Sequence, residues 1–141
     1  MRTLLALIMC LALLPAVASA QQVRQMLNGL RAENGLGPLQ PSEALEKAAM
    51  AHAMDLARTG KFSHTGSDGS RPMKRAKRQG YRGCFVAENI AKGQKTVTEV
   101  MGGWARSPGH RKNMLSRKAK EYGLVRAEGN IWVLVLGSTR C

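Results

Sequence analysis

Apolar residues in the first part of the chain recur at the spacing of amphipathic helices. Val23, Met26, Leu27 and Leu30 fall on one helical face, and the pattern stops at Gly35, a residue that readily adopts the left-handed conformation of a helix end. We therefore expect a first helix that buries one face and is followed by the connector LGPLQP.

A second helix is expected to begin after Ser42, which is a favourable N-cap residue. Its apolar stripe contains Leu45, Ala49, His52 and Leu56, and its many alanines make it slim enough for close packing. Because His52 lies on that stripe, we interpret it as a histidine of the core or its rim, bonded to a neighbour, in preference to a catalytic residue.

The middle of the chain alternates between polar loops and short elements. The loop KFSHTGSDGSRP leads into a short basic helix, for which Pro72 suits the first turn. The segment CFVAENIA indicates a strand interrupted by the polar pair Glu88-Asn89. Thr96 and Glu99 then have the T-x-x-E spacing of a capping box, which predicts another helix with Trp104 on its inner face.

The pattern changes to strands at the end of the chain. EYGLVRAEGNIWVLVLGS indicates two strands, and the second is a nearly continuous apolar run suited to the middle of a sheet. With CFVAENIA this makes three antiparallel strands and about four helices, in one domain without repeats or long linkers. The predicted fold class is α+β, a three-layer α-β-α sandwich with a small antiparallel sheet.

Residues 1–20 have the features of a secretory signal peptide. Arg2 precedes an apolar run from Leu4 to Leu14, and Ala18-Ser19-Ala20 has the A-x-A pattern of a cleavage site. An uncleaved membrane anchor is the alternative, but the run of about eleven residues is shorter than the roughly twenty that span a bilayer. We expect a domain over 21–141 that is secreted or periplasmic.

The charge balance narrows the class of partner. The net charge is +13, and it becomes +12 when the leader removes Arg2. Aromatic residues are too scarce for a base-stacking surface, so for an exported protein we expect no nucleic acid but an anionic membrane, lipopolysaccharide or another acidic envelope component. The basic helix offers a candidate anionic-surface patch, although a solvated face is the alternative: Lys74, Arg75, Lys77 and Arg78.

Two cysteines remain after the leader, which contains Cys10, is removed. In an oxidising compartment, an even number of cysteines favours a disulfide between Cys84 and Cys141. Two buried free thiols are the alternative.

Few residues have the surroundings of a chemical site. His64 and His110 lie in polar loops, but 45 residues separate them and their spacing matches no compact zinc motif. Glu88, in an otherwise apolar strand, must be paired, hydrogen-bonded or facing a cleft. Ser63 and Ser107 lie near histidines, but no G-x-S-x-G turn supports a serine nucleophile.

The order of these segments resembles a known family. HAMDLA, FSHTGSDGSRP, GYRGCFVAENIAKG, GGWARSPGHRKNML and YGLVRAEGNIWVLVLG together are similar to bacterial members of the CAP superfamily. That superfamily is named for cysteine-rich secretory proteins, antigen 5 and pathogenesis-related 1, and its domain is also called the SCP domain. The resemblance covers nearly all of residues 23–137, and A-E-N-I-A with S-P-G-H-R-x-N is specific in combination.

The resemblance implies an α-β-α sandwich with a cleft lined by two histidines and two acidic residues. By position the histidines are His64 and His110, and the first acid is Glu88. Glu99 is the candidate for the fourth cleft residue, although its capping role explains it equally well. Some members hold a divalent metal between the histidines, so we expect a divalent metal, with zinc the best candidate, at His64 and His110.

The resemblance also indicates function, though fold does not fix it. Some members bind sterols, fatty acids or other lipids. We therefore expect a monomeric, secreted or periplasmic binding module, not an enzyme, whose cleft holds a lipid or other small envelope ligand. The alternative is a metal-dependent hydrolase with Glu88 as general base, but two protein ligands are one fewer than most catalytic zinc sites have.

Overall fold

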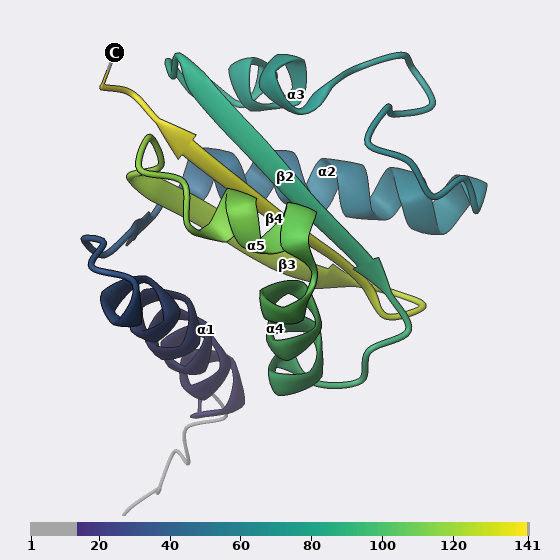
Figure 1. The fold of residues 1–141 in the computed structure, drawn as a ribbon. Helices are drawn as coiled ribbons and strands as arrows, with labels where there is room; N and C mark the ends of the chain where they lie inside the picture. Colours follow the sequence, from purple (N-terminus) through teal and green to yellow (C-terminus); the bar gives the residue numbers. More distant parts are fainter. Residues whose placement is uncertain (1–13, 141) are drawn as a thin grey trace, which may run out of the picture.

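The structure is a computed structural model that describes residues 14–140, with side chains described from Ser19 onward (Figure 1). Its elements, in chain order, are α1 (Leu14–Glu33), β1 (Gln40–Pro41), α2 (Glu43–Thr59), α3 (Pro72–Arg78), β2 (Phe85–Lys92), α4 (Val97–Arg106), α5 (Pro108–Met114), β3 (Glu121–Ala127) and β4 (Ile131–Ser138).

The sheet has the strand order β1-β3-β4-β2. β4 is antiparallel to both β2 and β3, which confirms the three predicted antiparallel strands. The sheet also contains β1, which was not predicted and pairs in parallel with β3 through Gln40 and Glu121. β1 has only two residues, one of them a proline, so the sequence pattern carries no periodicity from which a strand could be predicted.

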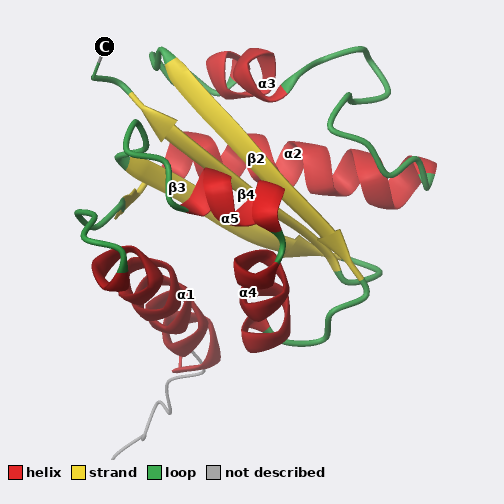
Figure 2. Ribbon diagram, viewed as in Figure 1, coloured by secondary structure: helices red, strands yellow, loops and turns green. Residues whose placement is uncertain are grey.

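Helices cover both faces of this sheet, as the prediction of an α-β-α sandwich required. One layer contains α1, α4 and α5, and the other contains α2 and α3 (Figure 2). The two faces of β4 belong to different cores: Trp132, Leu134 and Leu136 pack in the first, and Ile131, Val133 and Val135 in the second. This is why β4 is apolar at almost every position, since a strand covered on both faces has no solvent side.

The predicted helix caps are present. The Ser42 hydroxyl accepts from the backbone N–H of Leu45 at 3.5 Å, and α2 ends at Gly60 with a φ of 69°, in the left-handed region. At α4 the Thr96 hydroxyl accepts from the N–H of Glu99 at 3.1 Å, and the Glu99 carboxylate accepts from the N–H of Lys95 at 2.8 Å. The capping box is therefore confirmed, with one variation: the Glu99 carboxylate binds the N–H of Lys95, which precedes the N-cap residue Thr96.

The basic helix α3 differs from the prediction at one position. Lys74 and Lys77 are exposed, but Arg75 is only 5% exposed and does not belong to a surface patch. Its guanidinium lies against the buried carboxylate of Glu88. The negative charge of that carboxylate offsets the hydration that the guanidinium loses on burial. Arg78 is exposed, although it forms an ion pair with Asp68.

Two predictions concern the ends of the chain. Most of the expected leader, residues 1–13, lies outside the described residues, and α1 begins at Leu14. Cys141 also lies outside them, so its pairing with Cys84 stays a prediction. Among the described helices, none combines the length and apolar character needed to cross a membrane.

Candidate functional site

Glu88 is the centre of the candidate site. Its side chain, on β2, is 1% exposed, and its two oxygens have different partners. Oε2 accepts a hydrogen bond from Nη2 of Arg75 at 2.7 Å, and Oε1 lies 2.8 Å from Nδ1 of His64. The expectation that this carboxylate is paired and hydrogen-bonded is confirmed.

Arg75 also holds the loop that carries His64. Its Nη1 donates to the carbonyl of Ser70 at 2.6 Å, and its Nη2 donates to the carbonyl of His64 at 3.1 Å. One buried guanidinium therefore fixes both the carboxylate and the backbone of the residue that contacts it. The sequence does not indicate this role, because Arg75 stands among neighbouring cations of the same helix.

The contact with Glu88 decides which nitrogen of His64 carries the proton. A carboxylate paired with arginine can only accept hydrogen bonds, so Nδ1 of His64 donates and Nε2 keeps its lone pair. The His64 side chain is 54% exposed, so the ring is accessible to solvent while its orientation is fixed from below. This is the arrangement in which carboxylates orient metal-binding histidines.

His52 lies behind this pair and has the structural role that was predicted for it. It is fully buried, and its Nε2 is 2.9 Å from the carbonyl of Ser63, to which it donates. Burial lowers the pKa of His52, and the negative charge of Glu88 opposes that effect only in part. Although its Nε2 is 3.6 Å from Oε1 of Glu88, we regard His52 as a neutral hydrogen-bonding group and not as an ion-pair partner.

His110 belongs to helix α5, although its segment was predicted to be a polar loop. Pro108 opens this helix, and Nδ1 of His110 lies 2.9 Å from the hydroxyl of Ser107, which precedes it. The ring stands 6.4 Å from that of Trp104, between centroids. The pKa of His110 is lowered, mainly by burial and further by a Coulomb interaction with His64, so the two histidines are within electrostatic reach of each other.

Two asparagines attach α5 to the sheet, and neither was predicted as a site residue. Nδ2 of Asn89 donates to the carbonyl of His110 at 3.1 Å, and Oδ1 of Asn89 accepts from Asn113 at 2.9 Å. Asn113 also contacts the carbonyl of Glu88 at 3.2 Å. Asn89 is fully buried next to Glu88, so the polar pair in the strand performs two tasks: Glu88 orients His64, and Asn89 positions the helix of His110.

A cavity of about 340 Å³ opens beside His110. Its walls combine apolar groups with Ser107, Gln94 and the ammonium group of Lys92. The remaining lining residues are Phe62, Ile90, Ala91, Val100, Gly103 and Trp104. A small molecule with an apolar body and an anionic or hydrogen-bonding end would match this lining.

Glu99 is not brought into this site. It is exposed, it does not line the cavity beside His110, and its carboxylate completes the cap of α4. Of the two interpretations of Glu99, the structure supports the helix cap, because an acid at the third position of a helix is held by the free N–H groups at its start. The predicted cleft is therefore reduced to His64, Glu88 and His110.

The donor set matches a weakly held metal ion better than a closed metal site. Within the part of the chain that the structure describes, no group of three or more histidine, cysteine, aspartate or glutamate side chains could hold a metal ion. His64 and His110 would supply two nitrogens, and water would complete the coordination. Such a set fits an ion that exchanges with solvent.

Comparisons with known proteins agree with this fold. The model of the cysteine-rich secretory protein family, CAP, matches residues 24–136. The Bacillus subtilis protein YkwD, described as uncharacterized, is 38% identical over 121 residues, which are 84% of this chain and 47% of that protein. The chain thus spans about half the length of this curated relative.

Two solved structures are similar as well. An extracellular protein of Bacillus anthracis that contains an SCP domain has a TM-score of 0.79 at 24% identity, over 83% of this chain and 39% of its own. An outer surface protein of Borrelia burgdorferi has a TM-score of 0.78 at 24% identity, over 86% of this chain and 92% of its own. At 24% identity the two structures show only that the fold is shared. The family match covers residues 24–136, which is most of the chain. The protein therefore belongs to the cysteine-rich secretory protein (CAP) family.

Proposed function

We propose that this protein is an extracellular binding module that holds a small envelope ligand at the cleft of His64, Glu88 and His110. The location outside the cytoplasm is supported by two similar structures, described as an extracellular protein and an outer surface protein. It is also consistent with the apolar leader pattern of residues 1–20.

The observation that carries the proposal is the buried contact between Glu88 and His64. Burying a carboxylate has a large desolvation cost, and Arg75 offsets it with a buried counter-charge. A protein that merely needed a stable strand would place an apolar residue at this position. The arrangement instead orients one exposed imidazole with a free Nε2, which is useful for binding a ligand or a metal ion.

A divalent metal held by the two histidines is part of this proposal, and zinc is among the ions that imidazole nitrogens bind well. When bound, such an ion supplies a positive charge and open coordination positions for an anionic group of the ligand. The protein contributes the fixed tautomer of His64, the position of α5 and the hydrogen bond between His110 and Ser107.

The cavity beside His110 supports a small, largely apolar ligand. Phe62, Ile90 and Trp104 contribute apolar walls, and Lys92 stands at the same cavity. A lipid-like molecule with an anionic or polar head would place its apolar part against these walls. Its head would then reach Lys92 or the histidine pair.

The geometry favours binding over the alternative, metal-dependent hydrolysis. That alternative needs Glu88 as a general base with access to water. Its carboxylate is 1% exposed and already engaged by Arg75 and His64. A group held in this way orients its neighbours, and proton abstraction would require it to break the pair with Arg75.

Zinc calorimetry tests the proposal. We expect weak binding by the wild type, reduced at least about tenfold in His64→Ala and in His110→Ala, since each removes a ligand. Binding should weaken as the pH falls through the range of histidine ionisation near 6.5, because protons compete for the nitrogens. Glu88→Gln should also weaken binding by about tenfold, because an amide no longer raises the basicity of His64.

Glu99→Gln is the matched control, since it removes the same charge from a residue outside the site. We expect its zinc affinity to equal that of the wild type. Zinc binding that is unchanged in both histidine variants would show that the cleft assignment is wrong.

A further inference from the structure

Helix α2 is apolar on the face that the fold buries and also along part of the side that it leaves exposed. Its inner face contains leucines and alanines: Leu45, Ala48, Ala49, Ala53 and Leu56. Its outer face presents a row that we call the outer stripe: Met50, Ala51, Met54 and Ala57. The exposed side of α2 also carries Glu46, Lys47 and Arg58, so the outer stripe is an apolar strip bordered by charged residues, an arrangement typical of contact surfaces.

The large exposed apolar side chains are close together in sequence. Among the described residues, the exposed large apolar side chains are Met54 at 60%, Phe62 at 48% and Met50 at 36%, and all lie on α2 or just after it. Isolated apolar side chains on a surface are common, but here all of them fall within thirteen positions of one another. A gathering of this kind marks a contact surface.

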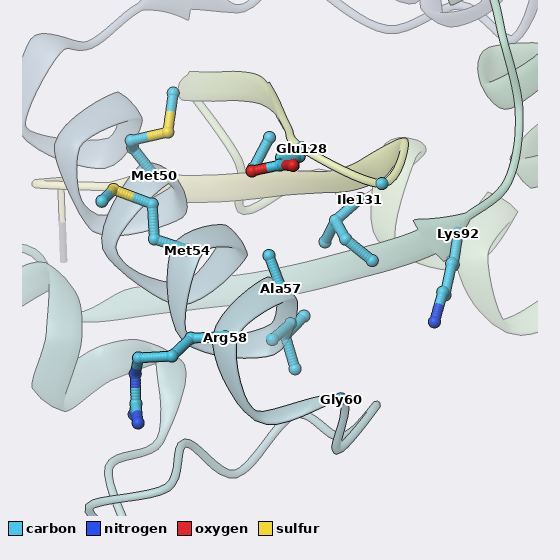
Figure 3. Close-up of a pocket in the computed structure, with 11 residues that line it drawn as sticks. Met50, Met54, Ala57, Arg58, Gly60, Lys92, Glu128 and Ile131 are labelled. Atoms are coloured by element: carbon cyan, nitrogen blue, oxygen red, sulfur yellow. The ribbon is translucent and has the colours of Figure 1, made fainter.

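The outer stripe borders a hollow of about 670 Å³ between α2 and the turn that joins β3 to β4 (Figure 3). Met50, Met54 and Ala57 line it from the helix, and Ile131 lines it from the strand. Methionine side chains are flexible and polarizable, so this surface can adapt to a partner without a fixed shape.

Cations lie around the outer stripe. Arg58 and Lys92 line the hollow, with Glu128 as the acidic group there, and Lys61 is exposed directly after α2. Arg58 forms an ion pair with Asp55 at 2.6 Å, so the positive charge of this rim comes mainly from the two lysines.

The neighbouring helix α3 adds more positive charge to the same layer. α3 packs beside α2, and its inward residues, Arg75 and Ala76, are buried. Lys74 and Lys77 are exposed and form no ion pair within the described residues. Both line a shallow basin around Met73. The layer of α2 and α3 thus presents the outer stripe and, on the neighbouring helix, two lysines that form no ion pair among the described residues.

We propose that this layer is a docking face for an anionic phospholipid bilayer. Its outer stripe enters the interface between headgroups and acyl chains, and Lys74 and Lys77 lie against the phosphates. A second copy of the chain fits less well, because two molecules of net charge +13 repel each other. An anionic bilayer matches both the charge and the adaptable apolar surface.

The two kinds of contact are needed together. A few partly inserted apolar side chains bind a bilayer only marginally, and electrostatic attraction alone leaves the orientation undefined. Lysines near an anionic surface contribute attraction that salt screens, whereas insertion of methionine is insensitive to salt. Binding should therefore weaken strongly with salt but retain its dependence on Met50 and Met54. The outer stripe and the α3 lysines do not line the cavity beside His110, and the proposal does not depend on the proposed ligand, although Lys92 borders both the cavity and the hollow.

Co-sedimentation of the full chain with phosphatidylglycerol vesicles tests this proposal, with phosphatidylcholine vesicles for comparison. We expect binding to the anionic vesicles at low salt. Met50→Ser with Met54→Ser should weaken it about tenfold, because each side chain loses its partial insertion. Lys74→Gln with Lys77→Gln should weaken it about thirtyfold, from the attraction of two basic residues.

The matched control is Arg117→Gln with Lys118→Gln, which removes the same charge from exposed residues in the loop after α5. It should reduce binding much less than the α3 lysine pair. Equal losses in these two charge variants would overturn the docking face, as would wild type that stays in the supernatant at low salt. Failure to bind vesicles together with concentration-dependent self-association, abolished in the methionine variant, would assign the outer stripe to a second copy instead.

Discussion

The two helical layers cover the same sheet with different kinds of interior. The layer of α1, α4 and α5 packs large apolar side chains against β4, among them Leu27, Met101 and Trp104, and its buried Arg31 donates to backbone carbonyls without a carboxylate partner among the described residues. The layer of α2 and α3 packs small alanines and, beside them, the buried polar groups His52, Arg75 and Glu88.

This difference separates the tasks of the two layers. The first layer supplies apolar area, from which most folding free energy comes. The second layer has small side chains, which leave space next to the sheet. Arg75 and Glu88 occupy this space, and their burial is tolerated because they pair with each other. We expect substitutions to affect stability for different reasons on the two sides, and the following experiments are ordered by the size of the expected effect.

Arg75→Ala should have the largest effect. It leaves the buried carboxylate of Glu88 without a counter-charge, and removing one member of a buried ion pair costs about 3–5 kcal/mol. Urea unfolding measures the free energy of unfolding. Arg71→Ala on the exposed side of the same segment is the control and should change it by less than about 0.5 kcal/mol. Equal effects of the two substitutions would remove the distinction between buried and exposed arginines of this segment.

Leu27→Ala examines the apolar layer by the same measurement. Leu27 is fully buried, and truncating a buried leucine costs about 2–5 kcal/mol through lost transfer energy and the cavity that remains. We expect a value near the middle of that range and no dependence on pH. Met54→Ala, on the exposed outer stripe, should have almost no effect on unfolding.

Most of the apolar layer could be predicted from the sequence, and most of the polar layer could not. Val23, Leu27 and Trp104 stand in helical periodicity, and burial follows directly from such a pattern. Arg75 stands among five other cations between positions 71 and 82, and nothing in local spacing distinguishes it from them. Only the tertiary contact with Glu88, thirteen positions away in sequence, reveals its role.

The same limit explains the remaining differences in the site. His64, Glu88 and His110 were singled out by their local surroundings, but only the resemblance to a family joined them in one cleft, since their spacing alone carries no signal. Helix α5 was missed because a proline and a glycine at its start are also typical of turns, and only its packing against β2 through Asn89 distinguishes the two. Glu99 had two interpretations, and the local one, the helix cap, is the one that the structure supports.

The pH dependence of stability should reveal the polar layer. The pKa of His52 is lowered in the folded protein, so between that value and about 6.5 the unfolded chain binds more protons than the folded one. The contribution of His52 to the free energy of unfolding is therefore complete above about pH 6.5. It decreases as the pH falls, by at most about 1.4 kcal/mol per pH unit. His110 contributes with the same sign.

Urea unfolding between pH 7 and pH 5 measures this slope. His52→Gln keeps a polar group at the position and removes its titration. The free energy of unfolding should then depend less steeply on pH, by the amount that His52 contributes. An unchanged slope in this variant would mean that His52 does not lose stabilisation on acidification. His110→Gln tests the other histidine in the same way.

The smallest effect on the free energy of unfolding is expected at the cap of α4. There the exposed Glu99 has a local role, unlike the buried Glu88. Thr96→Ala removes an acceptor for the N–H of Glu99 and should cost about 1 kcal/mol in urea unfolding. Glu99→Gln should cost less than that, since an amide oxygen can still accept from Lys95. A loss of several kcal/mol in Glu99→Gln would give this residue a role beyond the cap.

The position of β4 has a consequence for how the molecule folds. β4 is the last strand in the chain, yet it lies between β3 and β2, and its alternating side chains belong to both cores. Neither core can close until residues 131–136 are in place. The two helical layers therefore complete their packing together, whichever of them forms first.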